Sequence, residues 1–362
     1  MNNFRKASFD QAEEVSDPAR LVREPLVSVL MLTFNHAAYI RQAVESVLVQ
    51  QTAFQFELLI GEDSSTDETR EIVLELQKKA PHIVRVIAWN ANVGMHHNFA
   101  ALIEVARGEF IAFCEGDDYW LACDKLQVQF GFMREHPECG LVHGNYLNLI
   151  RIGGTWRTRL AFRRSSQLQH RSGAIYPAML AANRIQTCTV LCRRGLVADY
   201  RRDGPGVDRY MVGDWPLFLY LTHQSGVGFI ERPLAAYRQT PGSIMNSGHQ
   251  AAVERGLDAI RMAGDFCDFF RDNVATREAA LAAQNRALLG LAFRAGDVQR
   301  FKQAWAWLAQ YRPGMLSSAR ARAMRATVGV PAFRKPALGA LAMIESIKHR
   351  IEFRRVDTEP LQ

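Results

Sequence analysis

The sequence predicts an α/β protein: a mostly parallel sheet with helices on both faces, followed by a helical C-terminal region. Through the first 150 residues, apolar segments of strand length alternate with segments of helical periodicity. The strand segments are apolar throughout, which is typical of strands buried on both faces of a parallel sheet. Strand signals stop after about residue 250, and only helical spacing continues from there.

The alternating part contains four predicted strands, at residues 26–33, 56–62, 83–88 and 109–114. Three helices are predicted between them, within residues 37–50, 66–79 and 92–108.

Polar residues at the ends of these helices predict how each helix begins and ends. Asn35 is expected to cap the first helix. Ser65, with Glu68 three residues later, has the pattern of a capping box for the second helix. Gly108 is the expected glycine just past the end of the third helix.

Composition divides the chain into three parts. Residues 1–24 are polar and mixed in charge, and we expect a flexible lead-in there. Residues 25–245 form the predicted main domain, and residues 250–362 form a helical region with a basic tail. Two segments of that region meet at Gly296 and Asp297 and predict a helical hairpin.

The bulk composition favours a cytoplasmic protein. The N-terminal residues have no signal-peptide pattern, and no run of 18 apolar residues predicts a transmembrane helix. The six cysteines form no CxxC pair and no spacing suited to zinc, which is typical of reduced cytosolic thiols.

The charges are distributed unevenly along the chain. Residues 1–150 carry 12 basic and 21 acidic side chains, residues 151–250 carry 14 and 5, and residues 251–362 carry 18 and 11. An acidic first part joined to a basic remainder suits a protein that binds a cation with one part and anions with the other. The sequence has no zinc finger, RNA-binding signature or basic recognition helix, so we do not expect a nucleic acid partner.

Polar loops follow three of the predicted strands directly. "TFNH" follows the first strand, "GEDSSTD" the second and "EGDD" the fourth. Because ligands bind at the carboxyl ends of the strands in open α/β sheets, these loops should line one cleft. Glu115, Asp117 and Asp118 in the last loop are hard oxygen ligands suited to Mg²⁺ or Mn²⁺. The alternative for such a cluster is a solvated turn in which one aspartate caps the next helix. No Walker A sequence is present, and no GxGxxG follows the first strand.

Taken together, these segments resemble family-2 glycosyltransferases of the GT-A fold. The resemblance covers about residues 27–240, and several motifs occur in the expected order and spacing. It implies inverting transfer of a sugar from a nucleotide-diphosphate donor, with Mn²⁺ or Mg²⁺ bound at an acidic motif usually written DxD. Here "EGD" stands in that place and Asp118 follows, so Asp117 is the expected principal ligand, with Glu115 and Asp118 beside it.

The resemblance also assigns residues to the donor. It implies that the nucleotide sugar, a UDP-sugar, contacts residues of the three loops, the turn after the third strand and a later Arg: Thr33, Phe34, Asn35, Glu62, Asp63, Asn92, Gly94, Glu115, Asp117 and Arg238. A mere turn residue is the alternative for Asn92. Arg238 lies in "YRQTPGS", where the family usually has His two residues after the Arg and this chain has Thr240. Asp67 is expected to cap its helix instead of binding a ligand.

The same resemblance places the general base at Asp214, just before the helical segment "WPLFLYLTHQ". A carboxylate there can accept the proton of an acceptor hydroxyl. Capping of the helix is the alternative and does not exclude catalysis. The QxxRW signature of processive synthases is absent, so transfer of single sugars is expected.

The implied acceptor is a growing surface glycan, such as lipopolysaccharide, or a lipid-linked sugar. Residues 311–355 hold ten basic and two acidic side chains, which predicts a peripheral contact with an anionic membrane. A sugar nucleotidyltransferase is an alternative, although the loop after the first strand lacks the Gly-rich, basic character that it needs. A non-catalytic glycan-binding protein is the other alternative.

Overall fold

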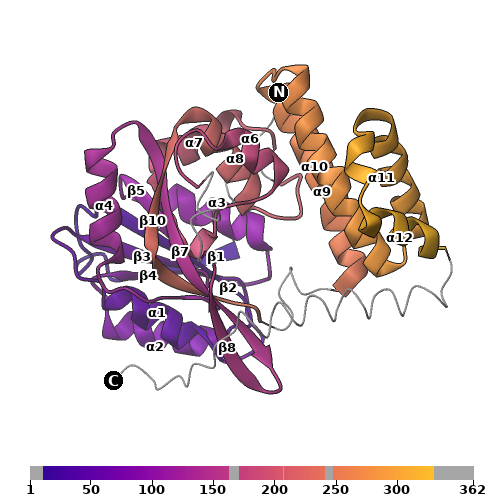
Figure 1. Cartoon of the computed structure of the whole chain (residues 1–362). Helices are drawn as coiled ribbons and strands as arrows, with labels where there is room; N and C mark the ends of the chain where they lie inside the picture. The colour runs from indigo at the N-terminus through magenta and orange to yellow at the C-terminus, as the bar shows by residue number, and fades with distance from the viewer. Residues whose placement is uncertain (1–10, 163–170, 207, 241–247, 330–362) are drawn as a thin grey trace. The chain divides into compact units, whose positions relative to one another are not determined.

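The computed structural model describes residues 11–162, 171–206, 208–240 and 248–329 (Figure 1). The chain forms two compact units. Of the described residues, the first unit contains 11–149, 160–162, 171–176, 183–206 and 208–238, and the second contains 150–159, 177–182, 239–240 and 248–329.

Ten strands of the described residues form one mixed sheet in the order β1-β4-β3-β2-β5-β9-β7-β10-β6, with β8 paired to β7. Their bounds are β1 Ala12–Val15, β2 Val27–Thr33, β3 Phe56–Glu62, β4 Val84–Trp89, β5 Phe110–Phe113, β6 Tyr119–Trp120, β7 Cys139–Ile152, β8 Thr155–Leu160, β9 Leu191–Arg193 and β10 Gly226–Arg238. Strands β4, β3, β2 and β5 are parallel, and β10 is parallel to β7, whereas β1, β6 and β9 pair antiparallel. The predicted α/β class with a mostly parallel sheet is confirmed.

The helices of the first unit are α1 Ile40–Leu48, α2 Thr69–Lys79, α3 Met95–Val105, α4 Lys125–Glu135, α7 Arg194–Asp203 and α8 Asp214–Gln224, with a 3-10 turn η2 at Thr187–Thr189. Helices α1 and α2 lie together on one face of the sheet, and α3 lies on the other (Figure 1). This follows from right-handed crossovers, because the chain runs outward from β2 to β4 and then returns to β5. Fully buried residues such as Val29, Leu58 and Val86 fill the interior.

The caps predicted for the first two helices are wrong. Helix α1 begins at Ile40, and Asn35 lies outside it with φ of 56°. Helix α2 begins at Thr69, and the side chain that accepts from the Thr69 amide is that of Asp67 (3.0 Å) instead of Ser65. Asn35 and Ser65 bond to each other instead of capping their own helices.

Gly108 has a different role from the one predicted. Helix α3 ends at Val105, and the amide of Gly108 donates to the hydroxyl of Ser28 (2.8 Å). A Cβ at Gly108 would lie 2.5 Å from the amide nitrogen of Ser28. The position therefore needs glycine because two backbone segments approach closely there.

The helical second unit contains α6 Tyr176–Ala181, α9 Gly248–Phe269, α10 Val274–Ala295, α11 Val298–Tyr311, a 3-10 turn η4 at Pro313–Leu316 and α12 Ala319–Thr327. The predicted hairpin is confirmed: Gly296, with φ of 74°, ends α10, and the side chain of Asp297 caps α11. Within the described ranges, no helix is long and apolar enough to cross a membrane. Most of the predicted basic tail lies outside the described residues.

Candidate active site

The three polar loops meet at the carboxyl edge of the parallel strands. The amide of Asp63, after β3, donates to the carbonyl of Thr33 at the end of β2 (3.1 Å). The amide of Gly116, after β5, donates to the carbonyl of Leu32 (2.9 Å). A Cβ at Gly116 would lie 2.7 Å from Oγ1 of Thr33, so only glycine fits between these loops.

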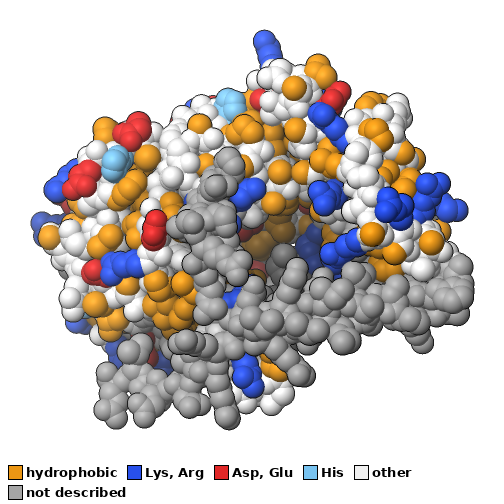
Figure 2. Space-filling view, in the orientation of Figure 1, with side chains coloured by type: hydrophobic (Ala, Val, Ile, Leu, Met, Phe, Trp, Pro, Cys, Tyr) orange, Lys and Arg blue, Asp and Glu red, His pale blue; other side chains and the backbone are white. Residues whose placement is uncertain are grey.

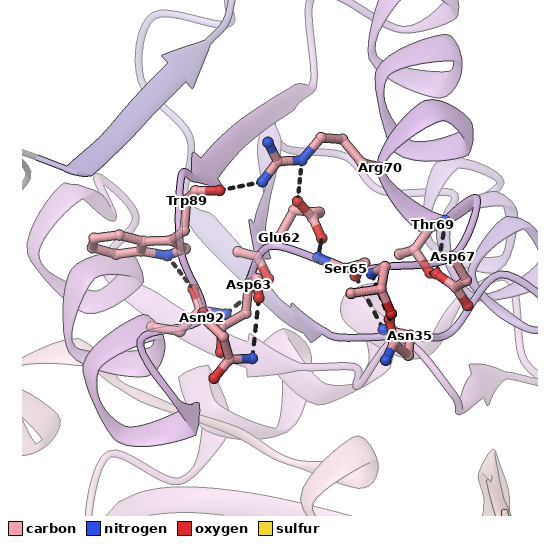
Figure 3. A network of polar contacts seen from close by, with 12 residues as sticks. Asn35, Glu62, Asp63, Ser65, Asp67, Thr69, Arg70, Trp89 and Asn92 are labelled. Atoms are coloured by element: carbon pink, nitrogen blue, oxygen red, sulfur yellow. Dashed lines mark hydrogen bonds and ion pairs between the residues drawn. The ribbon is translucent and has the colours of Figure 1, made fainter.

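The loop after β2 is bonded to the loop after β3 by Asn35 (Figure 3). Its amide donates to Oγ of Ser65 (3.0 Å), and its side-chain oxygen accepts from the amide of Thr66 (2.8 Å). Thr33 is buried, whereas the neighbouring Phe34 is 41% exposed. The loop therefore presents an aromatic ring to solvent from a fixed backbone.

Glu62 is fully buried at the end of β3, and its carboxylate has partners on both oxygens (Figure 3). The Ser65 amide donates to Oε1 (2.7 Å), and Arg70 forms an ion pair with Oε2. Arg70 also donates to the carbonyl of Trp89. These contacts make Glu62 a residue that positions the loop after β3.

Asp63 holds the turn that leads into α3 (Figure 3). Its two carboxylate oxygens accept from the amides of Val93 (2.7 Å) and Gly94 (3.0 Å). The side chain of Asn92 donates to the Asp63 carbonyl (3.1 Å). Burial raises the pKa of Asp63, and the two amides act against that rise. Gly94 has φ of 82°, a backbone conformation that favours glycine.

The acidic loop contains a buried carboxylate oxygen without a partner. Among the described residues, Oε2 of Glu115 has no hydrogen-bond partner. Burial raises the pKa of Glu115 to about 8, and the nearby carboxylates of Asp117 and Asp214 add to the rise. Such an oxygen costs stability unless a cation or donor binds it.

Asp118, the last residue of the acidic loop, is buried and bonded to the end of β10. It is 1% exposed, and its Oδ1 accepts from the backbone amide of Arg238 (2.8 Å). Burial raises the pKa of Asp118, and the charges of Asp117 and Glu115 act in the same direction.

Arg238, at the end of β10, fixes the acidic loop through its side chain. Nη1 donates to the carbonyl of Asp117 (2.8 Å), and Nη2 donates to the side chain of Gln42. Its guanidinium lies 4.5 Å from the ring centroid of Tyr119 and 5.3 Å from that of Tyr39. Burial lowers the pKa of Arg238.

Asp214 is the first residue of α8 and has one hydrogen bond on each carboxylate oxygen. Oδ1 accepts from the amide of Trp215 (2.7 Å), and Oδ2 accepts from the hydroxyl of Thr187 (2.7 Å). Burial raises its pKa, and these bonds oppose the rise. Because its charge raises the pKa of Glu115, Asp214 belongs to the same site as the acidic loop.

Three residues that position this site were not assigned from the sequence: Arg70, Gln42 and Thr187. Arg70 and Gln42 lie on helices, where an exposed face explains a polar residue equally well. Thr187 lies in the short turn η2, and no sequence signal pairs it with Asp214.

The donor set fits a divalent cation that also binds a substrate. No group of three His, Cys, Asp or Glu side chains that could hold a metal ion occurs in the described part of the chain. Mg²⁺ and Mn²⁺ commonly use one or two carboxylates together with substrate phosphates. Glu115, with its partnerless oxygen, and the adjacent Asp117 supply that number.

Comparison with known proteins gives the family. The model of glycosyl transferase family 2 matches residues 28–197. An uncharacterized protein of Mycobacterium tuberculosis is 32% identical over 62% of this chain and 61% of its own length. The match thus spans about three fifths of the relative's length.

Two further proteins match. The Escherichia coli UDP-Glc:alpha-D-GlcNAc-diphosphoundecaprenol beta-1,3-glucosyltransferase WfgD is 33% identical over 33% of this chain and 46% of its own. The mannosyltransferase PcManGT from Pyrobaculum calidifontis, solved with GDP-Man and Mn²⁺, has a TM-score of 0.52 at 17% identity and covers 87% of this chain and 86% of its own. Residues 28–197 thus match glycosyltransferase family 2, and the fold is that of the GT-A glycosyltransferases.

Proposed function

We propose that the protein is an inverting, metal-dependent glycosyltransferase that moves single sugars from a nucleotide-diphosphate donor to a hydroxyl of a surface glycan or lipid-linked acceptor. The observation that carries the proposal is the buried, partnerless Oε2 of Glu115, beside Asp117 and close to Asp214. A protein that only binds glycans has no need for three carboxylates at such close range.

Asp117 and Glu115 would hold Mn²⁺ or Mg²⁺ together with the donor diphosphate. When bound, the metal would neutralise the charge that develops on the departing diphosphate. Asp118 would position the acidic loop, since its carboxylate accepts a hydrogen bond from the backbone amide of Arg238. The Mn²⁺ in the PcManGT complex supports this assignment by analogy of fold.

The nucleotide would lie across the loops after β2 and β3. The exposed ring of Phe34 offers a surface on which a base can stack, beside Asn35. Thr33 and Glu62 would shape the pocket from behind, since both are buried. Asp63 would place the 92–94 turn, with Asn92 and Gly94, beside the ribose. We propose UDP as the nucleotide because WfgD uses UDP-Glc.

In the transfer step, the acceptor oxygen forms a bond to the anomeric carbon as the bond from that carbon to the β-phosphate oxygen breaks. Asp214 would accept the proton of the acceptor hydroxyl. Each of its oxygens has one protein partner, which leaves a lone pair for the incoming hydroxyl. Arg238 would contribute by holding the acidic loop and through its positive charge near the diphosphate.

We propose that the acceptor is bound at the inner face of the cytoplasmic membrane. WfgD acts on a diphosphoundecaprenol-linked sugar, which supports a lipid-linked acceptor. Residues 311–329 carry four arginines and no acidic side chain: Arg312, Arg320, Arg322 and Arg325. Basic side chains are visible over α11 and α12 in Figure 2. Each basic residue near an anionic leaflet contributes about 1 kcal/mol to binding.

The test is incubation of the full chain with a panel of UDP- and GDP-sugars and Mn²⁺, with and without an undecaprenyl-diphosphate-linked sugar. We expect release of the nucleoside diphosphate, strongest with a UDP-sugar, and its loss on addition of EDTA. Pyrophosphate exchange would show a sugar nucleotidyltransferase instead, and silence with every donor would favour a binding protein. Salt-sensitive co-sedimentation with anionic liposomes checks the membrane contact separately.

A further inference from the structure

Asp214 receives a hydrogen bond from a residue on a distant part of the chain. The hydroxyl of Thr187 donates to Oδ2 at 2.7 Å, and the two residues are 27 positions apart. The other oxygen, Oδ1, accepts from the amide of Trp215, the next residue in the same helix. Among the described residues, Thr187 is the side-chain donor to this carboxylate.

Thr187 lies in the turn η2, which buried side chains hold from two sides. The indole nitrogen of Trp120 donates to the carbonyl of Cys188 (3.0 Å). The side-chain amide of Gln129 donates to the carbonyl of Thr189 (2.7 Å). Trp120 and Gln129 are 3% and 0% exposed. The turn therefore has little freedom to move relative to β6 and α4.

Lys125 joins these two supports. Its ammonium donates to Oε1 of Gln129 (2.7 Å) and lies 4.0 Å from the ring centroid of Trp120. It is fully buried, so it fixes the orientation of both side chains. Strand β6, which contains Trp120, directly follows the acidic loop, so the residues that support η2 are connected to the proposed metal-binding loop.

Helix α8, which contains Asp214, also packs against the strand that precedes the acidic loop. Phe218, in α8, makes an edge contact with Phe113 at the end of β5, with ring centroids 6.4 Å apart. The backbone of α8 is thus fixed against the strand that leads into the acidic loop. Two contacts restrict the rotation of the Asp214 side chain: the Trp215 amide on Oδ1 and the Thr187 hydroxyl on Oδ2. The Thr187 hydroxyl is the one that comes from outside helix α8.

We propose that Thr187 is a positioning residue for the general base: its hydroxyl holds Asp214 so that the free lone pair of Oδ2 faces the acceptor hydroxyl. This inference rests on the proposed role of Asp214. Thr187 touches no reacting atom in this account, and it acts only through the carboxylate. A side chain of the same shape without the hydroxyl should therefore leave donor binding intact and slow the transfer step.

The experiment is a double-mutant cycle with Thr187→Val and Asp214→Asn, read as kcat and KM with the UDP-sugar that the donor panel identifies. Asp214→Asn should lower kcat at least about 100-fold. Thr187→Val should lower kcat about 10- to 100-fold with the donor KM unchanged, which is the effect of losing a hydrogen bond to a charged group. Added to Asp214→Asn, it should cause little further loss. Thr187→Ser should restore most of the rate.

Two controls separate the possible failures. Thr222→Val removes a buried hydroxyl of the same helix that donates to the Leu219 carbonyl, and it should leave kcat unchanged. Urea unfolding of the four cycle proteins measures the Thr187–Asp214 coupling without any activity, and we expect about a 10-fold coupling in the unfolding equilibrium.

A normal kcat in Asp214→Asn would overturn the base itself and with it the proposed mechanism. A normal kcat in Thr187→Val, with Asp214→Asn impaired, would overturn only the positioning role. Full additivity in both rate and stability would show that the two side chains act independently, which also contradicts the inference. If wild-type protein releases no diphosphate from any donor, the proposed function fails, and the unfolding cycle still decides the contact.

Discussion

Glu57 and Glu115 lie at opposite ends of the parallel sheet, and the oxygens of their carboxylates have opposite surroundings. At the amino end, Glu57 in β3 is fully buried, and its oxygens accept from the Ser28 hydroxyl (2.7 Å), the Arg107 amide (2.8 Å) and Arg85 (3.0 Å). These partners hold its pKa below the usual value in spite of burial. At the carboxyl end, Glu115 has a partnerless oxygen and a pKa raised to about 8.

The difference separates a structural acid from a functional one. A buried carboxylate with every oxygen paired is compatible with a stable fold, because its partners compensate the cost of desolvation. A buried carboxylate with an unpaired oxygen and acidic neighbours costs stability until a ligand supplies the missing charge. Glu115 therefore lowers the stability of the unliganded protein at the carboxyl end of the strands. In an open α/β sheet this is the end at which ligands bind.

The largest expected effect is on catalytic rate, and it concerns Asp117 in the acidic loop. Asp117→Asn should lower the rate of donor turnover by about 1,000-fold or more, because an amide cannot supply the charge that binds the metal. The measurement is release of nucleoside diphosphate with Mn²⁺. Glu75→Gln, which removes an exposed partner of Arg41 and Lys79, is the matched control and should keep full activity. Undiminished turnover by the Asp117 variant would remove the metal role.

The next effect tests the structural end. Glu57→Gln should lower the free energy of unfolding by about 3–5 kcal/mol, because it leaves buried arginine charge without its partner. Glu115→Gln should change stability by less than about 1 kcal/mol, since no hydrogen bond to its Oε2 is lost. Urea unfolding of both variants checks the pair. Equal destabilisation would abolish the distinction between the two ends.

His143 is a buried side chain with a hydrogen-bond partner on one ring nitrogen, and it should affect stability in a pH-dependent way. Nε2 of His143, in β7, lies 2.8 Å from the carbonyl of Arg171, whereas Nδ1 has no partner among the described residues. Burial lowers its pKa to about 4, so the folded protein keeps it neutral. As the pH is lowered below the ordinary His pKa of about 6.5, the unfolded chain binds a proton at this position and the folded protein does not. The free energy of unfolding should therefore decrease as the pH is lowered from about 6.5 to about 4.

The full loss should approach about 3 kcal/mol, and His143→Gln should flatten that part of the stability profile. Urea unfolding at several pH values measures it. The same slope in the variant would mean that other groups cause the pH dependence.

Asp63 gives a smaller effect at the functional end. Asp63→Ala should weaken UDP binding by about 1–3 kcal/mol, because it releases the amides of Val93 and Gly94 and thus the turn beside the ribose. Asn92→Ala removes one bond to the Asp63 carbonyl and should cost less. Calorimetric titration with UDP measures both, and an unchanged affinity in the Asp63 variant would place the nucleotide elsewhere.

The smallest effect concerns backbone strain. Ser64, in the loop after β3, has φ of 59°, a conformation that costs a residue with a Cβ about 1 kcal/mol. Ser64→Gly should therefore raise the free energy of unfolding by up to about 1 kcal/mol. Part of this gain is offset, because glycine gives the unfolded chain more conformational entropy. A clear loss of stability would show that the Ser64 side chain makes a contact worth more than the strain.

The strands of the sheet could be predicted from the sequence, whereas the contacts of the loops between them could not. Strand β3 occupies residues 56–62 as predicted, because a continuous apolar segment has few other places to be buried. The helix caps were wrong because Asn35 and Ser65 bond to each other's loops. Such contacts depend on which loops the fold brings together, and local sequence does not record that.

The site shows the same limit. The acidic loop and Asp214 could be chosen from their place after a strand and before a helix. The bond from Arg238 to the Asp117 carbonyl spans 121 positions, and the Thr187 contact joins two segments with no shared motif. Residue type and spacing thus predicted which groups do chemistry, but the structure was needed to assign those that hold them in place.

The central claim is that the carboxyl end leaves charge unpaired for a metal-bound diphosphate. Calorimetric titration of UDP into the full chain, with and without Mn²⁺, tests this most directly. We predict that Mn²⁺ tightens UDP binding at least about 10-fold in the wild type and has no such effect in Asp117→Asn. Equal UDP affinity with and without Mn²⁺ in the wild type would contradict the account.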